Sequence, residues 1–172
     1  MADTAFMLKT FDFSVGIFVH GLTNLKVLLT KAEAHASSLA LEPSALLTAK
    51  LAGDMYDLAA QTHWAAEGAK LAVNRLLGVA AMPLAGDAKS FAELHERIDA
   101  AIVALNAADS ELLEAGLARS IALPYRGGSK EFRGDVFLAE FAIPSFFFHL
   151  TTAYGILRHS GVPLQKGDFL GG

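Results

Sequence analysis

The sequence predicts an all-α protein built as a four-helix bundle, and three observations support this fold class. Apolar residues recur at alternating spacings of three and four over most of the chain, which is typical of amphipathic helices. Hydrophobic residues make up 53% of the 172 residues, and cysteine is absent. A chain of this length can bury a stable core without disulfide bonds. We therefore expect one bundle domain that spans residues 1–172.

The first two helices are predicted to be long. The first begins at Thr4, a suitable N-cap, and ends before Pro43. The second runs from Ser44 to Gly78 and contains many alanines, which allow helices to approach closely and leave room for a pocket. The first apolar seam consists of Leu8, Phe11, Val15, Phe18, Leu22, Leu25, Leu29, Ala32 and Ala36. The second consists of Leu51, Met55, Leu58, Thr62, Ala65, Ala69, Ala72 and Leu76.

A third helix is predicted from Ser90 to about Asn106. Ser90 and Glu93 have the spacing of a capping box, in which each side chain satisfies a free backbone N–H of the first turn. After this helix, Asp109 or Ser110 is expected to cap a short further turn, which Gly116 ends.

A small hairpin or extended excursion is predicted between the third and fourth helices. Apolar residues alternate with other residues before the glycine pair at 127–128, which is a turn signal. The helical period returns at Asp135 and continues to Ser160. Pro144 lies inside this run, so we expect a kink or a restart there. Phe169 and Leu170 in the tail are expected to anchor it on the bundle or on a partner.

Composition and charge exclude several classes of function. The chain has 14 Lys and Arg against 18 Asp and Glu, and no basic cluster, so we expect no nucleic-acid partner. The segment 141–157 has no formal charge, but it contains Pro144 and His149 and is bounded by charged residues, so we expect a buried helix and no membrane span. The start of the chain lacks a basic signal region, which favours a cytoplasmic protein.

Histidine and oxygen ligands remain for any metal site, because there is no cysteine. His149 falls about 60° from the centre of the fourth helix's apolar face, beside the hydroxyls of Ser145 and Thr152. It is therefore expected to be partly or fully buried. A core histidine with an ordinary hydrogen bond, a metal ligand and a general base are all open interpretations.

The second helix offers partners for His149. Asp54 and Gln61 lie one heptad apart on nearly the same side, either as an interhelical polar tie or as part of a pocket. His63 lies about 200° around the helix from Gln61, beside Trp64. Gln61 and His63 are thus not expected to point into one site.

The fourth helix and tail, FAIPSFFFHLTTAYGILRHSGVPLQKGDFLGG, resemble the ending of an uncharacterised bacterial family within the DinB/YfiT-like superfamily. The segments LAGDMYDLAAQTHWAAEGAKLAVNRLLG and FAELHERI fit the same family, so the resemblance covers essentially the whole chain. It implies a DinB-like four-helix bundle, often dimeric, in a superfamily whose members typically hold a divalent metal through three histidines. Some relatives are thiol-dependent transferases, isomerases or hydrolases.

By this resemblance, His149 takes the place of the second histidine of the fourth helix. The first, four residues earlier, would fall at Ser145, and the second-helix ligand would fall near His63. Two histidines without a carboxylate do not make a tight site for zinc or nickel, so the resemblance supports the fold more strongly than the metal.

Two functional hypotheses follow from the sequence. In the first, Asp54, Gln61, Ser145, His149 and Thr152 line an apolar pocket that binds a small molecule without catalysis. In the second, His149 with His63 or Asp54 binds a divalent ion, and the protein is a metal-dependent hydrolase or transferase. A homodimer is expected in either case, because the alanine-rich and phenylalanine-rich faces exceed what one core needs.

Overall fold

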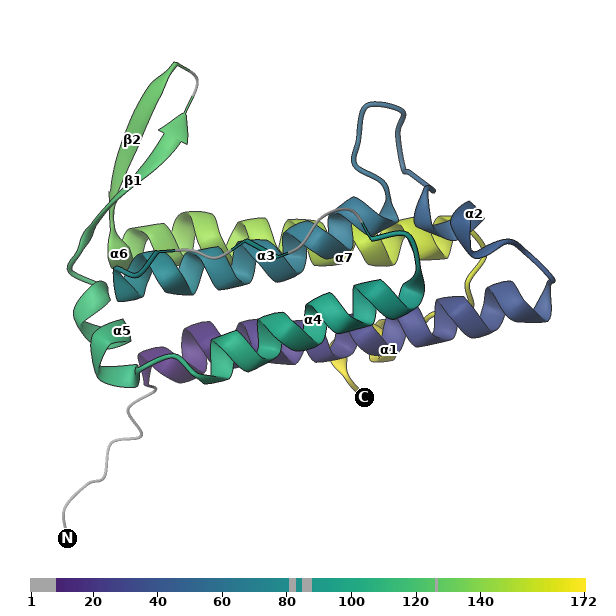
Figure 1. Cartoon of the computed structure of the whole chain (residues 1–172), viewed down its shortest axis with the longest axis horizontal. Coiled ribbons are helices and arrows are strands. Elements are labelled where there is room, and N and C mark those ends of the chain that lie inside the picture. Colours follow the sequence, from purple (N-terminus) through teal and green to yellow (C-terminus); the bar gives the residue numbers. More distant parts are fainter. Residues whose placement is uncertain (1–8, 81–82, 85–87, 126) are drawn as a thin grey trace, which may run out of the picture.

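Four long helices lie side by side in the computed structural model, which describes residues 9–80, 83–84, 88–125 and 127–172 (Figure 1). The all-α bundle predicted from the apolar seams is therefore confirmed. The long helices are α1 (Ile17–Ser38), α3 (Leu58–Leu77), α4 (Phe91–Asn106) and α7 (Ile143–His159). Thr4 and Leu8, predicted as the N-cap and first seam residue of the first helix, lie outside the described residues.

The bundle has two pairs of helices. Figure 1 shows α3 beside α7, running in opposite directions, and α1 beside α4, also running in opposite directions. The seam residues of the first helix from Val15 onward are buried, as are those of α3 from Leu58 to Leu76, so the core lies between the pairs.

Short elements connect and extend the long helices. A segment of π-helix, η1 (Asp12–Gly16), precedes α1, and α2 (Pro43–Leu47) follows it. After α4 come α5 (Ser110–Gly116), the strands β1 (Ser120–Tyr125) and β2 (Gly128–Arg133), and α6 (Gly134–Val136). A second π-helical segment, η2 (Phe137–Ala142), leads into α7, and α8 (Lys166–Leu170) ends the chain.

The second long helix begins later than the sequence analysis predicted, at Leu58 and not at Ser44. The chain leaves the short helix α2 at Thr48, and residues 48–57 form turns closed by backbone hydrogen bonds, including Leu58 N to Ala49 O at 3.0 Å. Asp57 then caps α3 by accepting a hydrogen bond from Ala60 N at 2.9 Å. A single helix from Ser44 to Gly78 is thus wrong. The helical spacing of Leu51 was not evidence of a helix, because Leu51 lies in a loop and packs over Gly155 of α7.

The N-caps predicted for the third helix and for the turn after it are confirmed, whereas the predicted capping box at Ser90 is only half formed. Ser90 Oγ accepts from Glu93 N at 3.2 Å, whereas the Glu93 carboxylate accepts from Lys89 N at 2.7 Å instead of from the cap residue itself. Asp109 caps α5 by accepting from the backbone N–H groups of Glu111 and Leu112.

The predicted hairpin is present, and two glycines fix it to the end of α3. β1 and β2 pair antiparallel, with Ile121 opposite Phe132. A Cβ on Gly116 would lie 2.2 Å from Leu76 O, and a Cβ on Gly134 would lie 2.1 Å from Gly116 O. No larger residue fits at either position without movement of backbone. The base of the hairpin is therefore held against the bundle, while the strands β1 and β2 extend away from it (Figure 1).

Pro144 lies directly after the π-helical segment η2, in the first turn of α7. Proline has no N–H to donate, and the first turn of a helix does not require one. The α-helical hydrogen bonding restarts at Ile143, which agrees with the predicted restart.

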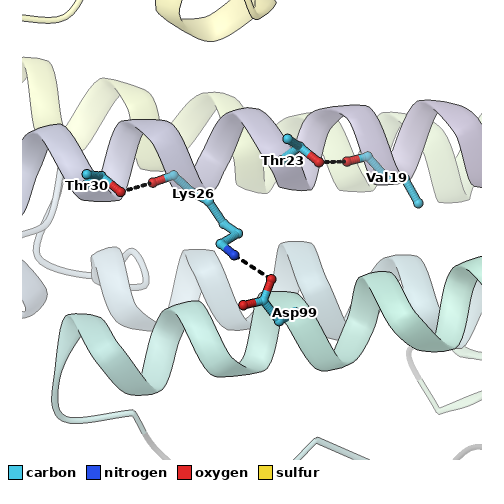
Figure 2. Close-up of polar contacts among 5 residues, drawn as sticks. All are labelled: Val19, Thr23, Lys26, Thr30 and Asp99. Atoms are coloured by element: carbon cyan, nitrogen blue, oxygen red, sulfur yellow. Dashed lines mark hydrogen bonds and ion pairs between the residues drawn. The ribbon is translucent and has the colours of Figure 1, made fainter.

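Polar contacts join α1 to α4 outside the core. Lys26 of α1 forms an ion pair with Asp99 of α4, with 2.5 Å between Nζ and Oδ1 (Figure 2). Thr23 and Thr30 donate their hydroxyls to the carbonyls of Val19 and Lys26 within α1, so they need no partner on α4. Both ends of the ion pair are partly exposed, and such pairs contribute about 0–1 kcal/mol.

The C-terminal tail packs on the bundle through Phe169, the first of its two predicted anchors. The Phe169 ring meets the Tyr154 ring at 5.6 Å, and Asn24 Nδ2 donates to Phe169 O at 3.1 Å. Lys31 also pairs with Asp168. Leu170 is 55% exposed, so it does not anchor the tail within one chain.

Two helical stretches, Asp12–Ser38 and Gly134–His159, are long and apolar enough to cross a membrane by length and composition. Their most apolar windows are 50% and 39% buried inside the bundle, respectively. Core helices of bundles share these properties, so the finding is weak evidence for a membrane span.

Candidate functional site

A cavity of about 310 Å³ lies between α3, β1 and the η2–α7 helix. Most of its wall is apolar and aromatic, and its polar groups are few, which is the usual composition of a ligand pocket. The polar side chains are those of Arg75, Ser145 and His149. The remaining lining residues are Trp64, Gly68, Leu71, Ala72, Leu123, Pro124, Phe137, Phe141, Ala142 and Phe146.

His149 is held in place by Gln61 of the neighbouring helix. The distance from His149 Nδ1 to Gln61 Oε1 is 2.8 Å, and Gln61 is 1% exposed. Gln61 Nε2 donates to Tyr56 O at 3.3 Å, which orients the amide so that its oxygen faces the ring. An amide oxygen only accepts hydrogen bonds, so Nδ1 of His149 carries the hydrogen.

This hydrogen bond leaves Nε2 of neutral His149 with a free lone pair. Gln61 does not line the cavity whereas His149 does, so Nε2 is the polar atom that the ring offers to it. No described residue forms a hydrogen bond with Nε2. Burial lowers the pKa of His149 below its usual value of about 6.5, because the charged ring is poorly solvated there. The neutral ring is therefore the form present at neutral pH.

Arg75, on the last turn of α3, brings a positive charge to the same cavity. Burial lowers the pKa of this guanidinium. Among the described residues, none forms a hydrogen bond or ion pair with the guanidinium of Arg75. A partly buried cation in an aromatic cavity is thus left without a counter-charge from the protein.

The structure brings together some of the predicted pocket residues and separates others. Ser145 and His149 line the cavity, and Gln61 lies behind His149. Thr152 is buried, but its hydroxyl donates to Phe148 O at 2.6 Å within its own helix and does not line the cavity. Asp54 is exposed in the loop before α3, so its prediction as a pocket residue on a helix is wrong.

His63 faces a second cavity, of about 550 Å³, on the other edge of α3. Its Nδ1 lies 3.5 Å from Nη1 of Arg97, and its ring meets Trp64 edge-on. His63 and His149 line different cavities, so the predicted pairing of these two histidines as metal ligands is wrong. Gln61 contacts His149 and not the cavity of His63, as its position around the helix predicted. The second cavity is lined by Tyr56, Asp57, Ala59, Ala60, His63, Trp64, Ala88 and Arg97.

The residues present do not fit the three-histidine metal site that the superfamily resemblance implies. The described part of the chain has no group of three or more His, Asp or Glu side chains arranged to hold a metal ion. In the first cavity Ser145 stands where a second histidine would be needed, and Arg75 adds a positive charge that disfavours a cation.

Sequence reasoning missed the wall that α3 contributes. Trp64, Gly68, Leu71 and Arg75 follow spacings of four, three and four, so they share one face of the helix. That face lies beside the core seam and contains a tryptophan, a glycine and an arginine. The spacing was available in the sequence, but it did not show that η2 and the hairpin would enclose the same space.

Comparisons with known proteins agree with this architecture. A family model described as "Domain of unknown function (DUF1993)" matches residues 10–170. The chain belongs to this DUF1993 family. It is also similar to a crystal structure of a DinB family member protein from Shewanella denitrificans, at 36% sequence identity and a TM-score of 0.87.

That similarity covers 94% of this chain and 92% of the Shewanella chain. The predicted resemblance to an uncharacterised DinB-like family is thus confirmed, together with the fold. No curated protein matches the DUF1993 chain. The comparisons therefore give a family and a fold, and the function has to be argued from the cavity.

Proposed function

We propose that this protein binds a small organic molecule in the cavity between α3, β1 and α7, without catalysing its conversion. The observation that carries the proposal is the hydrogen-bonded pair of His149 and Gln61 at a cavity whose wall is mostly apolar and aromatic. The buried amide fixes the ring, and the ring presents one hydrogen-bond acceptor to the cavity. Apolar walls with a few fixed polar groups are what orient a small ligand.

The size of the cavity supports the same function. About 310 Å³ is at the lower end of the ~300–1,000 Å³ of typical ligand pockets, so a ligand of one ring or a short chain fits best. The π-helical segment η2 contributes Phe137 and Phe141 to the wall, and such segments occur frequently at functional sites.

A fragment screen monitored by tryptophan fluorescence tests this proposal. Trp64 is the only tryptophan of the chain and lines the cavity, so an occupant changes its emission directly. We expect one-ring fragments to alter the fluorescence in a saturable way, and His149→Ala to weaken those that carry a hydrogen-bond donor. If no fragment binds to the folded protein, the proposal is wrong. Val103→Ala, far out on the surface of α4 at 70% exposure, is the matched control.

We also propose that the chain forms a homodimer through the outer face of α7. On this face Phe148 is 55% exposed, Phe141 one heptad earlier is 44% exposed, and the adjacent Phe147 is 37% exposed. A cluster of large aromatic side chains at the surface is typical of an interaction site. Light scattering at micromolar concentration is expected to give the mass of a dimer, and Phe148→Glu to give a monomer. A monomeric mass of the unmodified protein would contradict this proposal, whereas Val103→Glu should leave the mass unchanged.

A further inference from the structure

We propose that the ligand of the α3–α7 cavity is a small apolar carboxylate whose anionic group pairs with Arg75. This inference rests on the proposed binding function and specifies the chemical class of the ligand. It depends on three features of the site: the unmatched charge, the independent capping of the helix end, and the arrangement of apolar and polar wall.

The unmatched charge is the first feature. A guanidinium has five N–H donors in a planar fork that fits a carboxylate through two parallel hydrogen bonds. A charged group that is taken from water without a partner is unfavourable, so such groups in protein interiors are normally paired. The described residues provide Arg75 with no acidic partner, and burial lowers its pKa with no opposing carboxylate. An anionic ligand would complete this arrangement.

The second feature removes the simplest structural explanation for Arg75. Arginine in the last turn of a helix often stabilises the free carbonyl groups at the helix end. At this helix end, Arg119 has that role: its Nε donates to Leu76 O at 3.3 Å, and its guanidinium lies against Gly78. Gly78, in a left-handed conformation with φ of 71°, also closes the helix through backbone hydrogen bonds to Arg75 O and Asn74 O. Capping of α3 is thus satisfied without the Arg75 side chain.

The third feature is the order of groups along the cavity. Arg75 and Trp64 are eleven residues apart on α3, which is about 16 Å at 1.5 Å per residue. Helical side chains lean toward the N-terminus of their helix, so the guanidinium lies over the turn before its own Cα and is nearer to the aromatic wall. The rings of Phe137, Phe141 and Phe146 line the same cavity as the guanidinium. A carboxylate at the arginine and an apolar body among the rings match this order.

Binding of 3-phenylpropionate and of its neutral amide, 3-phenylpropionamide, tests the inference. The two molecules have nearly the same shape and differ in charge. Trp64 fluorescence reports both, with unmodified protein, Arg75→Gln, Arg75→Lys and Arg119→Gln compared at one ionic strength. Circular dichroism and thermal unfolding show whether each variant is folded.

We expect the carboxylate to bind about 10- to 100-fold more tightly than the amide, as one charge-assisted hydrogen-bonded pair provides. Arg75→Gln should remove this preference, Arg75→Lys should keep part of it, and Arg119→Gln should leave it within twofold. Equal binding of acid and amide to the unmodified protein overturns the carboxylate inference while the cavity remains a binding site. If neither probe binds, the carboxylate inference is overturned. A fragment screen without hits would separately overturn the proposed function.

Discussion

The two cavities on either edge of α3 both contain a histidine, an arginine and the side of Trp64, yet they differ in how their polar groups are bonded. In the second cavity, His63 lies against Arg97, and Asp57 accepts a hydrogen bond from the first turn of α3. In the first, His149 is bonded on one side only and Arg75 has no partner among the described residues. The polar groups near the second cavity are bonded to other parts of the protein, whereas those of the first remain available to a ligand.

The largest expected effect comes from separating the first cavity from its β1 wall. Gly116→Ala places a Cβ 2.2 Å from Leu76 O, so the hairpin base must move away from α3. We expect the free energy of unfolding to fall by roughly 3 kcal/mol, as for severe overpacking, measured by urea denaturation. Gly53→Ala has open space around it and should change stability by less than about 0.5 kcal/mol. Similar values for both variants would show that the hairpin base is not held by this contact.

The next effect tests the pair that distinguishes the first cavity. Gln61→Leu leaves the His149 Nδ1–H without its acceptor in a half-buried position, and we expect a loss of about 2 kcal/mol in urea denaturation. His149→Leu in the same chain removes the orphaned donor, so the double variant should be more stable than the sum of the two single losses predicts. Strictly additive losses would mean that the two side chains do not interact.

A smaller effect is expected at the second cavity. Asp57→Ala removes the N-cap of α3, which should lower the free energy of unfolding by about 1 kcal/mol. Because Asp57 does not line the first cavity, binding of one-ring fragments beside Trp64 should stay within twofold. If Asp57→Ala abolished fragment binding in a folded protein, the two cavities would not be separable as described.

The smallest effect is a pH dependence from His149. Burial lowers the pKa of its ring in the folded state, so the unfolded chain binds the proton more readily between that pKa and about 6.5. The contribution of neutral His149 is complete above about pH 6.5 and is lost as the pH falls toward the folded-state pKa. The free energy of unfolding of the unmodified protein, measured in urea, should therefore fall more steeply with acidification over this interval than that of His149→Gln. Parallel curves would contradict the burial of the ring.

Most of the fold was predictable because its signals are local. The α1 seam, the Ser90 and Asp109 caps and the Gly127 turn each depend on residues within one or two turns of chain. The loop before α3 was not predictable in the same way. Leu51 has helical spacing relative to Leu58, but it makes its contact with Gly155 across the bundle, and periodicity does not separate these cases.

The candidate site was predictable in part. Both His149 and Gln61 were identified from their positions near the apolar faces, and the structure joins them at 2.8 Å. Arg75 was not identified, because an arginine near a helix end has an ordinary explanation in capping. That Arg119, 43 residues from the carbonyl it bonds, takes this role is a property of the tertiary structure. Nothing in the local sequence of α3 contains that information.

One nitrogen-15 NMR titration tests the central claim, which is that the first cavity binds the ligand through groups the fold leaves unpaired. Side-chain signals of His149, Arg75, His63 and Arg97 are followed together while 3-phenylpropionate is added. We predict that His149 is protonated at Nδ1 before the addition, and that the Arg75 signals then shift in a saturable way while those of His63 and Arg97 stay unchanged. Shifts confined to His63 and Arg97, or a His149 ring protonated at Nε2 instead, would contradict the account.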